Sequence, residues 1–294
     1  MFRIDGWYVN LEVDRDGDAP LRFEHRSGDR GTLWEGDRCL HQDVEVISTP
    51  LHAPGQAFIN LDERCRFSCR FCSSPLLDHE RYKVPDLQRL VDRLVAAATS
   101  GEVTSFALTS GVWPDFDGAI ERMASVVAQL HQRTGLPIGV EPLAQHAGHL
   151  RQLRQAGASE LKLNIQAATE EIFSAVCPGL SYARQWELLA EGVRLFGRGR
   201  VTSNLIIGLG EHDEEVEAAV RHLGDIGVVV TLRRLHTTSL IEEGLANALG
   251  GSPPRIGAER HLSLARSTRQ ILEQRGLETG TFSTMCHACK GCDL

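Results

Sequence analysis

Short apolar runs alternate with longer amphipathic stretches from about residue 57 onward. The runs have the composition of buried strands, and they read "AFINL", "VTSFALTS", "LPIGVE", "SELKLNIQ", "VTSNLIIGLG" and "VVVTLRRLH". The stretch "DLQRLVDRLVAAATSG" lies between the first two runs and is typical of an amphipathic helix. Its apolar side chains share one helical face: Leu87, Leu90, Val91, Leu94 and Val95. This alternation predicts an α/β fold made of parallel βα units with right-handed crossovers.

The number of units favours a barrel over an open, doubly wound sheet. At least six units precede His236, and a further amphipathic helix follows in "AERHLSLARSTRQILEQRG". A doubly wound sheet needs helices on both faces, whereas a barrel needs only an outer ring of helices. We therefore expect a partial or full (β/α) TIM-type barrel. In such a barrel the chemistry lies in the loops that follow the strands.

The two ends of the chain differ from the middle. Residues 1–52 hold short strand-like runs between Asp- and Gly-rich turns, and they predict a small β-rich cap packed on the barrel. Residues 53–275 form the predicted barrel. Residues 276–294 form a predicted cysteine-rich C-terminal tail.

Charge and hydropathy exclude some classes of function. The net charge of −8 and the lack of a Lys- or Arg-rich block argue against a nucleic-acid partner. No apolar run has the length of a membrane span, and "MFRIDGWYVN" lacks the core of a signal peptide. These features predict a cytoplasmic protein. In a reducing compartment, clustered cysteines more often bind metal or do redox chemistry than form disulfides.

Six of the eight cysteines fall in two short clusters. The first, "CRFSCRFC", spaces Cys65, Cys69 and Cys72 as C-x3-C-x2-C in the loop after the first predicted strand. Three thiolates on one loop can bind three irons of a [4Fe–4S] cluster and leave the fourth iron open to a small molecule. Zinc is the alternative metal, but a structural zinc site requires four ligands, and His79 is the one nearby candidate.

This cysteine motif, with Phe71 before its last cysteine, resembles the signature of the radical S-adenosylmethionine (SAM) superfamily. The resemblance covers roughly residues 57–275 and is strongest to the biotin synthase-like branch, which includes the biotin-synthase-like type of lipoyl synthase. It implies that Cys65, Cys69 and Cys72 hold the catalytic cluster. It also implies that SAM is cleaved reductively to a 5′-deoxyadenosyl radical, which abstracts hydrogen from the substrate.

Four further segments resemble the SAM-binding segments of this family. "LTSG" stands where the family binds the methionine amine, and "LKLNIQAAT" resembles the fourth-strand segment of biotin synthases. "SYARQWELL" resembles the helix whose arginine meets the SAM carboxylate, and "SNLIIGLGE" resembles the fifth-strand segment that contacts adenine. The cofactor-binding residues implied are Thr109, Ser110, Gly111, Asn164, Gln166, Arg184, Asn204, Ile206 and Gly208.

Two positions depart from the family pattern. The second-strand turn reads "TSG" rather than Gly-Gly-Glu, so amine binding would use backbone carbonyls and the hydroxyl of Thr109 or Ser110. Gln166 stands where biotin synthases carry an acidic residue for the SAM ribose. A neutral amide binds a hydroxyl less strongly than a carboxylate does. Glu141, which ends the third predicted strand, is the alternative carboxylate, and otherwise it is a solvated loop residue.

The second cluster, "CHACKGC", spaces Cys286, Cys289 and Cys292 as C-x2-C-x2-C near the end of the chain. This spacing is typical of ferredoxins and predicts a second, auxiliary [4Fe–4S] cluster, with zinc or no metal as the alternative. Its fourth ligand is left open among His287, Cys39, Cys177, substrate or none. Cys177, in "AVCPGL", is better explained as a buried apolar residue.

Two clusters favour sulfur insertion of the lipoyl or biotin synthase kind, with the auxiliary cluster as sulfur source. The alternative is a rearrangement, methylation or oxidation in which the second cluster relays electrons or holds substrate. An iron–sulfur carrier is a third reading, but it would need no SAM pocket. The implied partners are a one-electron donor such as flavodoxin or ferredoxin, a small-molecule or acyl-protein or peptide substrate, and a second radical SAM subunit.

Overall fold

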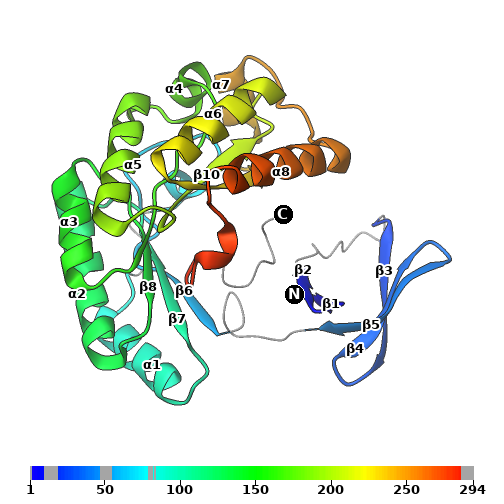
Figure 1. The fold of residues 1–294 in the computed structure, drawn as a ribbon, viewed down its shortest axis with the longest axis horizontal. Helices are drawn as coiled ribbons and strands as arrows, with labels where there is room; N and C mark the ends of the chain where they lie inside the picture. The colour runs from blue at the N-terminus through cyan, green and yellow to red at the C-terminus, as the bar shows by residue number, and fades with distance from the viewer. Residues whose placement is uncertain (1, 10–18, 47–54, 79–81, 83, 286–294) are drawn as a thin grey trace.

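The computed structural model describes residues 2–9, 19–46, 55–78, 82 and 84–285. Six parallel strands form the central sheet, in the order β11-β10-β9-β8-β7-β6. They are β6 (Gln56–Asn60), β7 (Ser105–Thr109), β8 (Ile138–Glu141), β9 (Glu160–Lys162), β10 (Val201–Ile207) and β11 (Val229–Arg234). Because strand order follows chain order, each crossover leads to the neighbouring strand. Figure 1 shows the sheet curving with its helices outside, which confirms the predicted partial barrel.

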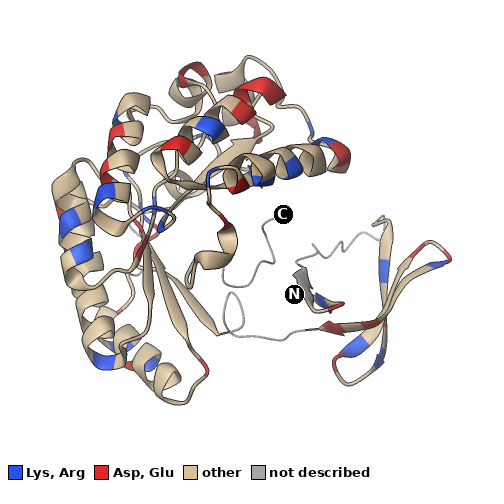
Figure 2. Cartoon of the chain, in the orientation of Figure 1, with Lys and Arg blue, Asp and Glu red and all other residues tan. Residues whose placement is uncertain are grey.

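Helices cover the outer face of the barrel (Figure 1). The long ones are α1 (Leu87–Thr99), α2 (Phe116–Thr134), α3 (Ala147–Ala156), α5 (Tyr182–Phe196), α6 (Asp213–Ile226) and α8 (Ala258–Glu273). The short ones are α4 (Glu170–Val176), α7 (Glu242–Leu249) and the 3-10 turns η1 (Ser74–Leu76) and η2 (Thr279–Thr281). Several begin at a side-chain cap, as at Asp86, Asp115, Thr169 and Ser181. Figure 2 shows acidic and basic residues interspersed along these helices.

The barrel core lies between the sheet and these helices. Phe106 and Leu108 of β7 are fully buried against Val127 and Leu130 of α2 and their neighbours. The same cluster continues through Leu161 to Val229. Apolar area removed from water on this scale is the main favourable term for the fold. No helix in the described ranges is long and apolar enough to span a membrane.

A separate antiparallel sheet precedes the barrel, as the β-rich N-terminal residues predict. Its order is β2-β1-β5-β4-β3. The strands are β1 (Phe2–Ile4), β2 (Trp7–Val9), β3 (Leu21–Ser27), β4 (Arg30–Glu35) and β5 (Arg38–Val46). Ile4, Leu33 and Val44 form its own small apolar core, which is not joined to the barrel core. Figure 1 shows this sheet to the side of the barrel.

Residues 277–285, which we call the C-terminal segment, pack into the barrel rather than away from it. Leu277 and Phe282 belong to the barrel core. Thr284 donates its backbone N–H to a carboxylate oxygen of Glu160 at 2.8 Å, and Met285 accepts a hydrogen bond from the side chain of Gln56. Glu160 and Gln56 begin their strands, so the segment occupies the amino-terminal end of the barrel.

Candidate cluster and cofactor site

One pocket opens at the carboxyl ends of the strands, opposite the C-terminal segment. Cys65, Cys69 and Cys72 all line it. Six of the predicted cofactor residues line it as well: Thr109, Ser110, Gly111, Glu141, Asn164 and Gln166. The structure therefore brings the three cysteines and most of the predicted SAM-binding residues to one cavity.

Backbone hydrogen bonds tie the start of the cysteine loop to the loop after β7. The N–H of Leu61 donates to the carbonyl of Thr109 at 2.9 Å, and the N–H of Gly111 donates to the backbone carbonyl of Asp62 at 2.7 Å. The N–H of Arg66 then donates to Val112 at 3.0 Å. A side chain at position 111 would overlap the carbonyl of Arg64, so the close approach requires glycine.

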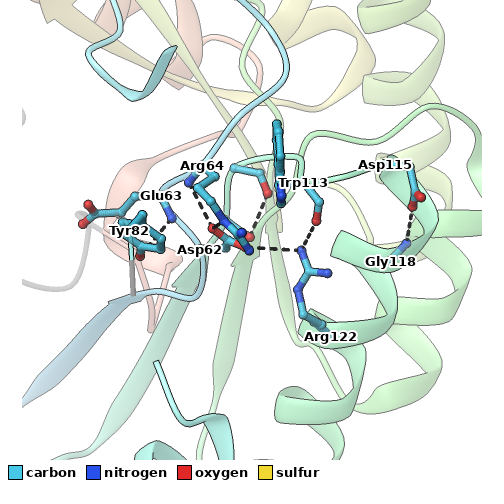
Figure 3. Close-up of polar contacts among 10 residues, drawn as sticks. Asp62, Glu63, Arg64, Tyr82, Trp113, Asp115, Gly118 and Arg122 are labelled. Carbon is cyan, nitrogen blue, oxygen red and sulfur yellow. Dashed lines mark hydrogen bonds and ion pairs between the residues drawn. The ribbon is translucent and has the colours of Figure 1, made fainter. Parts of the chain in front are cut away.

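A buried carboxylate supports this contact (Figure 3). Asp62 is fully buried and accepts two hydrogen bonds from the guanidinium of Arg64, at 3.0 and 2.8 Å. Arg122 of α2 lies 3.7 Å from the same carboxylate and donates to the carbonyl of Trp113. The Arg64 guanidinium also lies over the rings of Tyr82 and Trp113. Since a buried charge is stable only when paired, these contacts fix the backbone next to Cys65.

The other side of the cysteine loop contacts α4. The N–H of Arg70 donates to the carbonyl of Val176 at 2.8 Å. Cys69 and Phe71 pack against the apolar cluster that contains Cys177. Contact with Cys177 lowers the pKa of Cys69. Three thiols around one pocket fit a [4Fe–4S] cluster.

The floor of the pocket is polar and charged. Glu141 has a side chain 17% exposed, and it accepts a hydrogen bond from the Asn164 amide at 2.6 Å. The ammonium of Lys162 lies 3.6 Å from its other carboxylate oxygen, and the Lys162 side chain is 5% exposed. Glu141 is thus a held, partly buried carboxylate at the pocket and not a solvated loop residue.

Gln166 has a positive φ of 65°, which is uncommon for a residue other than glycine. Two backbone hydrogen bonds with β10 hold Gln166 in this conformation. Its N–H donates to the carbonyl of Asn204 at 3.1 Å, and its carbonyl accepts from the N–H of Ile206 at 2.7 Å. Strained residues of this kind cluster at binding sites.

Four predicted cofactor residues do not line the pocket. Arg184 lies in the first turn of α5, 55% exposed, and its guanidinium pairs with Glu187 at 2.7 Å. Asn204 accepts a hydrogen bond from Arg233 at 3.3 Å, and Ile206 is buried in the apolar cluster around Cys177. Gly208 donates its N–H to the buried carboxylate of Glu211 at 2.7 Å.

Some pocket residues were not anticipated from the sequence. Gln185, next to Arg184 on α5, is 4% exposed and lines the pocket. Phe67 and Phe71, the aromatic residues of the cysteine motif, also line it. Lys162, which does not line the pocket but pairs with Glu141, was missed because a lysine in a strand is ordinarily expected to face solvent.

A second group of ligand-type side chains comes from α2, from α3 and from the N-cap residue of α3. Ligand atoms of Asp117, His146 and His149 are within 4.8 Å of one another. The N–H of Gln145 donates to Nδ1 of His149 at 3.2 Å, so Nε2 carries the ring proton and donates to Asp117 at 2.7 Å. Both ring nitrogens of His149 are occupied, which leaves this ring no lone pair for a metal ion.

The predicted second cluster lies outside the described residues, because Cys286, Cys289 and Cys292 fall after Met285. His287, one possible fourth ligand, lies outside them too. Of the other two, Cys39 is on β5 of the N-terminal sheet, and Cys177 is beside Cys69.

Comparisons with known proteins agree with this geometry. The model of the Radical SAM superfamily matches residues 59–223. The chain is 31% identical over 177 residues to a lipoyl synthase of Mycolicibacterium gilvum (strain PYR-GCK), covering 58% of this chain and 53% of that protein. It is 29% identical over 177 residues to a lipoyl synthase of Frankia casuarinae, covering 56% and 49%. The chain spans about half the length of these curated relatives.

Among solved structures, HydG, a maturase of the [FeFe]-hydrogenase, has a TM-score of 0.62 at 15% identity. The match covers 76% of this chain and 51% of HydG, and at this identity it shows the fold alone. The family model covers more than half of the chain, including the end of β6, the cysteine loop and the whole of β7, β8, β9 and β10. The chain belongs to the radical SAM superfamily.

Proposed function

We propose that this chain is a radical SAM enzyme that inserts sulfur into an unactivated C–H position of an acyl substrate, as a lipoyl synthase does. The convergence of Cys65, Cys69 and Cys72 with Glu141 and Asn164 in one pocket carries the enzymatic part of the proposal. The lipoyl synthase relatives and the second cysteine cluster support the sulfur-insertion part.

Cys65, Cys69 and Cys72 would hold the [4Fe–4S] cluster, which supplies the electron that cleaves the sulfonium of SAM to a 5′-deoxyadenosyl radical. Glu141, held by Asn164 and Lys162, would accept hydrogen bonds from the ribose hydroxyls. Backbone carbonyls and hydroxyls of residues 109–111 would bind the methionine amine. The barrel walls around the pocket would limit the access of water to the radical.

Cys286, Cys289 and Cys292 would hold the auxiliary cluster, and its sulfide is the second substrate. The acyl substrate would be carried on a protein or peptide. A second radical SAM subunit is a further partner in this proposal.

A one-electron donor is the other partner that this chemistry requires. Arg66 and Arg70 project from the cysteine loop and are exposed. Flavodoxins and ferredoxins are acidic, and opposite charges steer such encounters. We propose that the electron donor docks on the surface of the cysteine loop that carries Arg66 and Arg70.

The test is anaerobic reconstitution of the full chain, with iron and sulfide counted per chain and 5′-deoxyadenosine measured. Wild type is compared with a Cys286→Ala/Cys289→Ala/Cys292→Ala variant. About eight irons per chain should fall to about four, with SAM cleavage retained. An octanoylated peptide should then gain sulfur with wild type only. Four irons in both proteins would remove the sulfur-donor proposal.

The assignment of the first cluster has its own control. Cys69→Ala should abolish 5′-deoxyadenosine formation, whereas Cys39→Ala, in the separate N-terminal sheet, should leave it unchanged. SAM cleavage by the Cys69 variant would refute the cluster assignment.

A further inference from the structure

Two loops meet at the edge of the pocket, and backbone hydrogen bonds join them at several points. Residues 61–66 lead from β6 into the cysteine motif, and residues 109–112 end β7 and continue beyond it. The hydrogen bonds donated by the N–H groups of Leu61, Gly111 and Arg66 connect one loop to the other. Both loops line the pocket, the first through a cysteine and the second through the residues proposed to bind the methionine amine. A shift of one loop would therefore displace the other.

Asp62 holds this junction from inside the protein. Its side chain has no exposed surface, and its carboxylate accepts the backbone N–H of Arg64 at 3.0 Å. A bond from an aspartate side chain to the N–H two residues later fixes a turn, which here lies at the start of the cysteine loop. The backbone carbonyl of Asp62 accepts from Gly111 at 2.7 Å. One residue thus contacts both loops, the first through its side chain and the second through its main chain.

Two guanidinium groups orient the Asp62 carboxylate (Figure 3). Arg64 donates to both carboxylate oxygens, from Nε at 3.0 Å and from Nη2 at 2.8 Å. Such a bidentate pair fixes direction as well as charge. Arg122 lies 3.7 Å from the carboxylate and donates to the carbonyl of Trp113, so the junction is also attached to α2.

Asp62, Arg64 and Arg122 are not among the described residues that line the pocket, so they act on its contents only through the two loops. We propose that Asp62 is a positioning residue that holds the cysteine loop and residues 109–111 as one unit, so that iron retention and SAM affinity depend on the same carboxylate. The inference rests on the proposed cluster and SAM assignments. Residues that orient metal ligands without touching the metal commonly change metal affinity by about 10–100-fold when they are substituted.

The test compares wild type with three variants of the reconstituted full chain. Asp62→Ala removes the acceptor, whereas Asp62→Asn keeps an acceptor oxygen for the N–H of Arg64 but loses the charge. Gly139→Ala overpacks the amino-terminal end of the barrel against Thr284 and controls for a loss of stability alone. The rate of iron release to a chelator and the SAM dissociation constant from equilibrium dialysis are measured for each protein. Urea denaturation gives the stability of the iron-free chains.

Asp62→Ala should release iron about tenfold faster and bind SAM about tenfold more weakly than wild type. Asp62→Asn should lie between the two in both properties. Gly139→Ala should match wild type in both, although its stability is lower. Wild-type values in Asp62→Ala overturn the proposal, and so does a change in only one of the two properties. An equal loss in Gly139→Ala overturns it as well, because stability would then be the cause.

Two further readings keep the proposal testable. If Asp62→Ala does not fold, Asp62→Asn alone decides, and wild-type values in that variant overturn the proposal. A wild type that binds no iron would refute the proposed function itself. The alkylation rate of Cys65 in the iron-free chain then still tests the loop, since Asp62→Ala should expose this thiol and react faster. Equal alkylation rates would show that Asp62 does not position the cysteine loop.

Discussion

Glu160 and Thr284, separated by more than a hundred residues, are joined by two hydrogen bonds from Thr284 to one buried carboxylate oxygen. The Thr284 backbone N–H donates at 2.8 Å, and its hydroxyl donates to the same oxygen. The other oxygen accepts from the N–H of Ser283 at 2.9 Å and from Arg200 at 3.0 Å. Glu160 therefore fixes two successive residues of the C-terminal segment, in addition to the hydrogen bond from Gln56 to Met285.

Substitution of this carboxylate should destabilise the whole barrel. Glu160→Gln places an amide NH2 against the N–H donors of the C-terminal segment and leaves these buried donors without an acceptor. The free energy of unfolding should fall by about 2–4 kcal/mol. Urea denaturation measures it. Glu187→Gln, which breaks an exposed pair with Arg184, should change stability by less than about 0.5 kcal/mol. Equal effects of the two substitutions would show that the C-terminal segment contributes little.

Gly139 offers a test of the same contact from the opposite side. An added Cβ would overlap the hydroxyl of Thr284 and lie 2.8 Å from Cε of Met285. Gly139→Ala should therefore cost about 1–3 kcal/mol through overpacking. Gly244, within α7, has no atom near its added Cβ, so Gly244→Ala should stabilise by about 0.5–1 kcal/mol. The prediction fails if thermal melts show both substitutions with the same sign.

Charge reversal on the cysteine loop should separate electron delivery from catalysis. An Arg66→Glu/Arg70→Glu variant should lose about tenfold or more in SAM cleavage with an acidic flavodoxin at low salt, because steering is lost. With dithionite, which needs no docking site, the rate should match wild type. Arg194→Glu/Arg221→Glu makes the same charge change on α5 and α6 and serves as the control. A matching loss in the control would mean that net charge alone is responsible.

The carboxylate on the pocket floor should contribute to SAM affinity. Glu141→Gln removes a charged acceptor worth about 1.5–3 kcal/mol, which weakens SAM binding roughly tenfold or more. It also leaves Lys162 buried without its counter-charge, so loss of folding is a competing explanation. Glu141→Gln/Lys162→Met should restore stability while SAM binding stays weak. Restoration of SAM binding in the double variant would show that Glu141 acts only on folding.

The sequence predicted the location of a site residue correctly where that residue ends a strand. Thr109 and Glu141 end neighbouring parallel strands, and such ends always meet at one edge of the sheet. Arg184 shows where prediction from sequence fails, because a shift of one residue along a helix rotates the side chain by about 100° to another face. Ser181 caps α5, and the resulting phase turns Gln185 and not Arg184 toward the pocket.

Buried charges were the other limit. Glu160 and Lys162 face the barrel interior because they have partners there, Thr284 and Glu141. Those partners are distant in the sequence, so no local pattern reveals them. Cys177 was correctly expected to be buried, but its contact with Cys69 depends on the same long-range packing.

The cysteine loop takes its shape from segments on both sides of it, residues 109–112 after β7 and Val176 at the end of α4. About a hundred residues separate the loop from Val176, so the three thiols converge only after several βα units have assembled. Iron and sulfide would then enter a barrel that is already folded. A peptide spanning the cysteine motif alone would lack both supports, and the order of events during maturation would be chain first, cluster second.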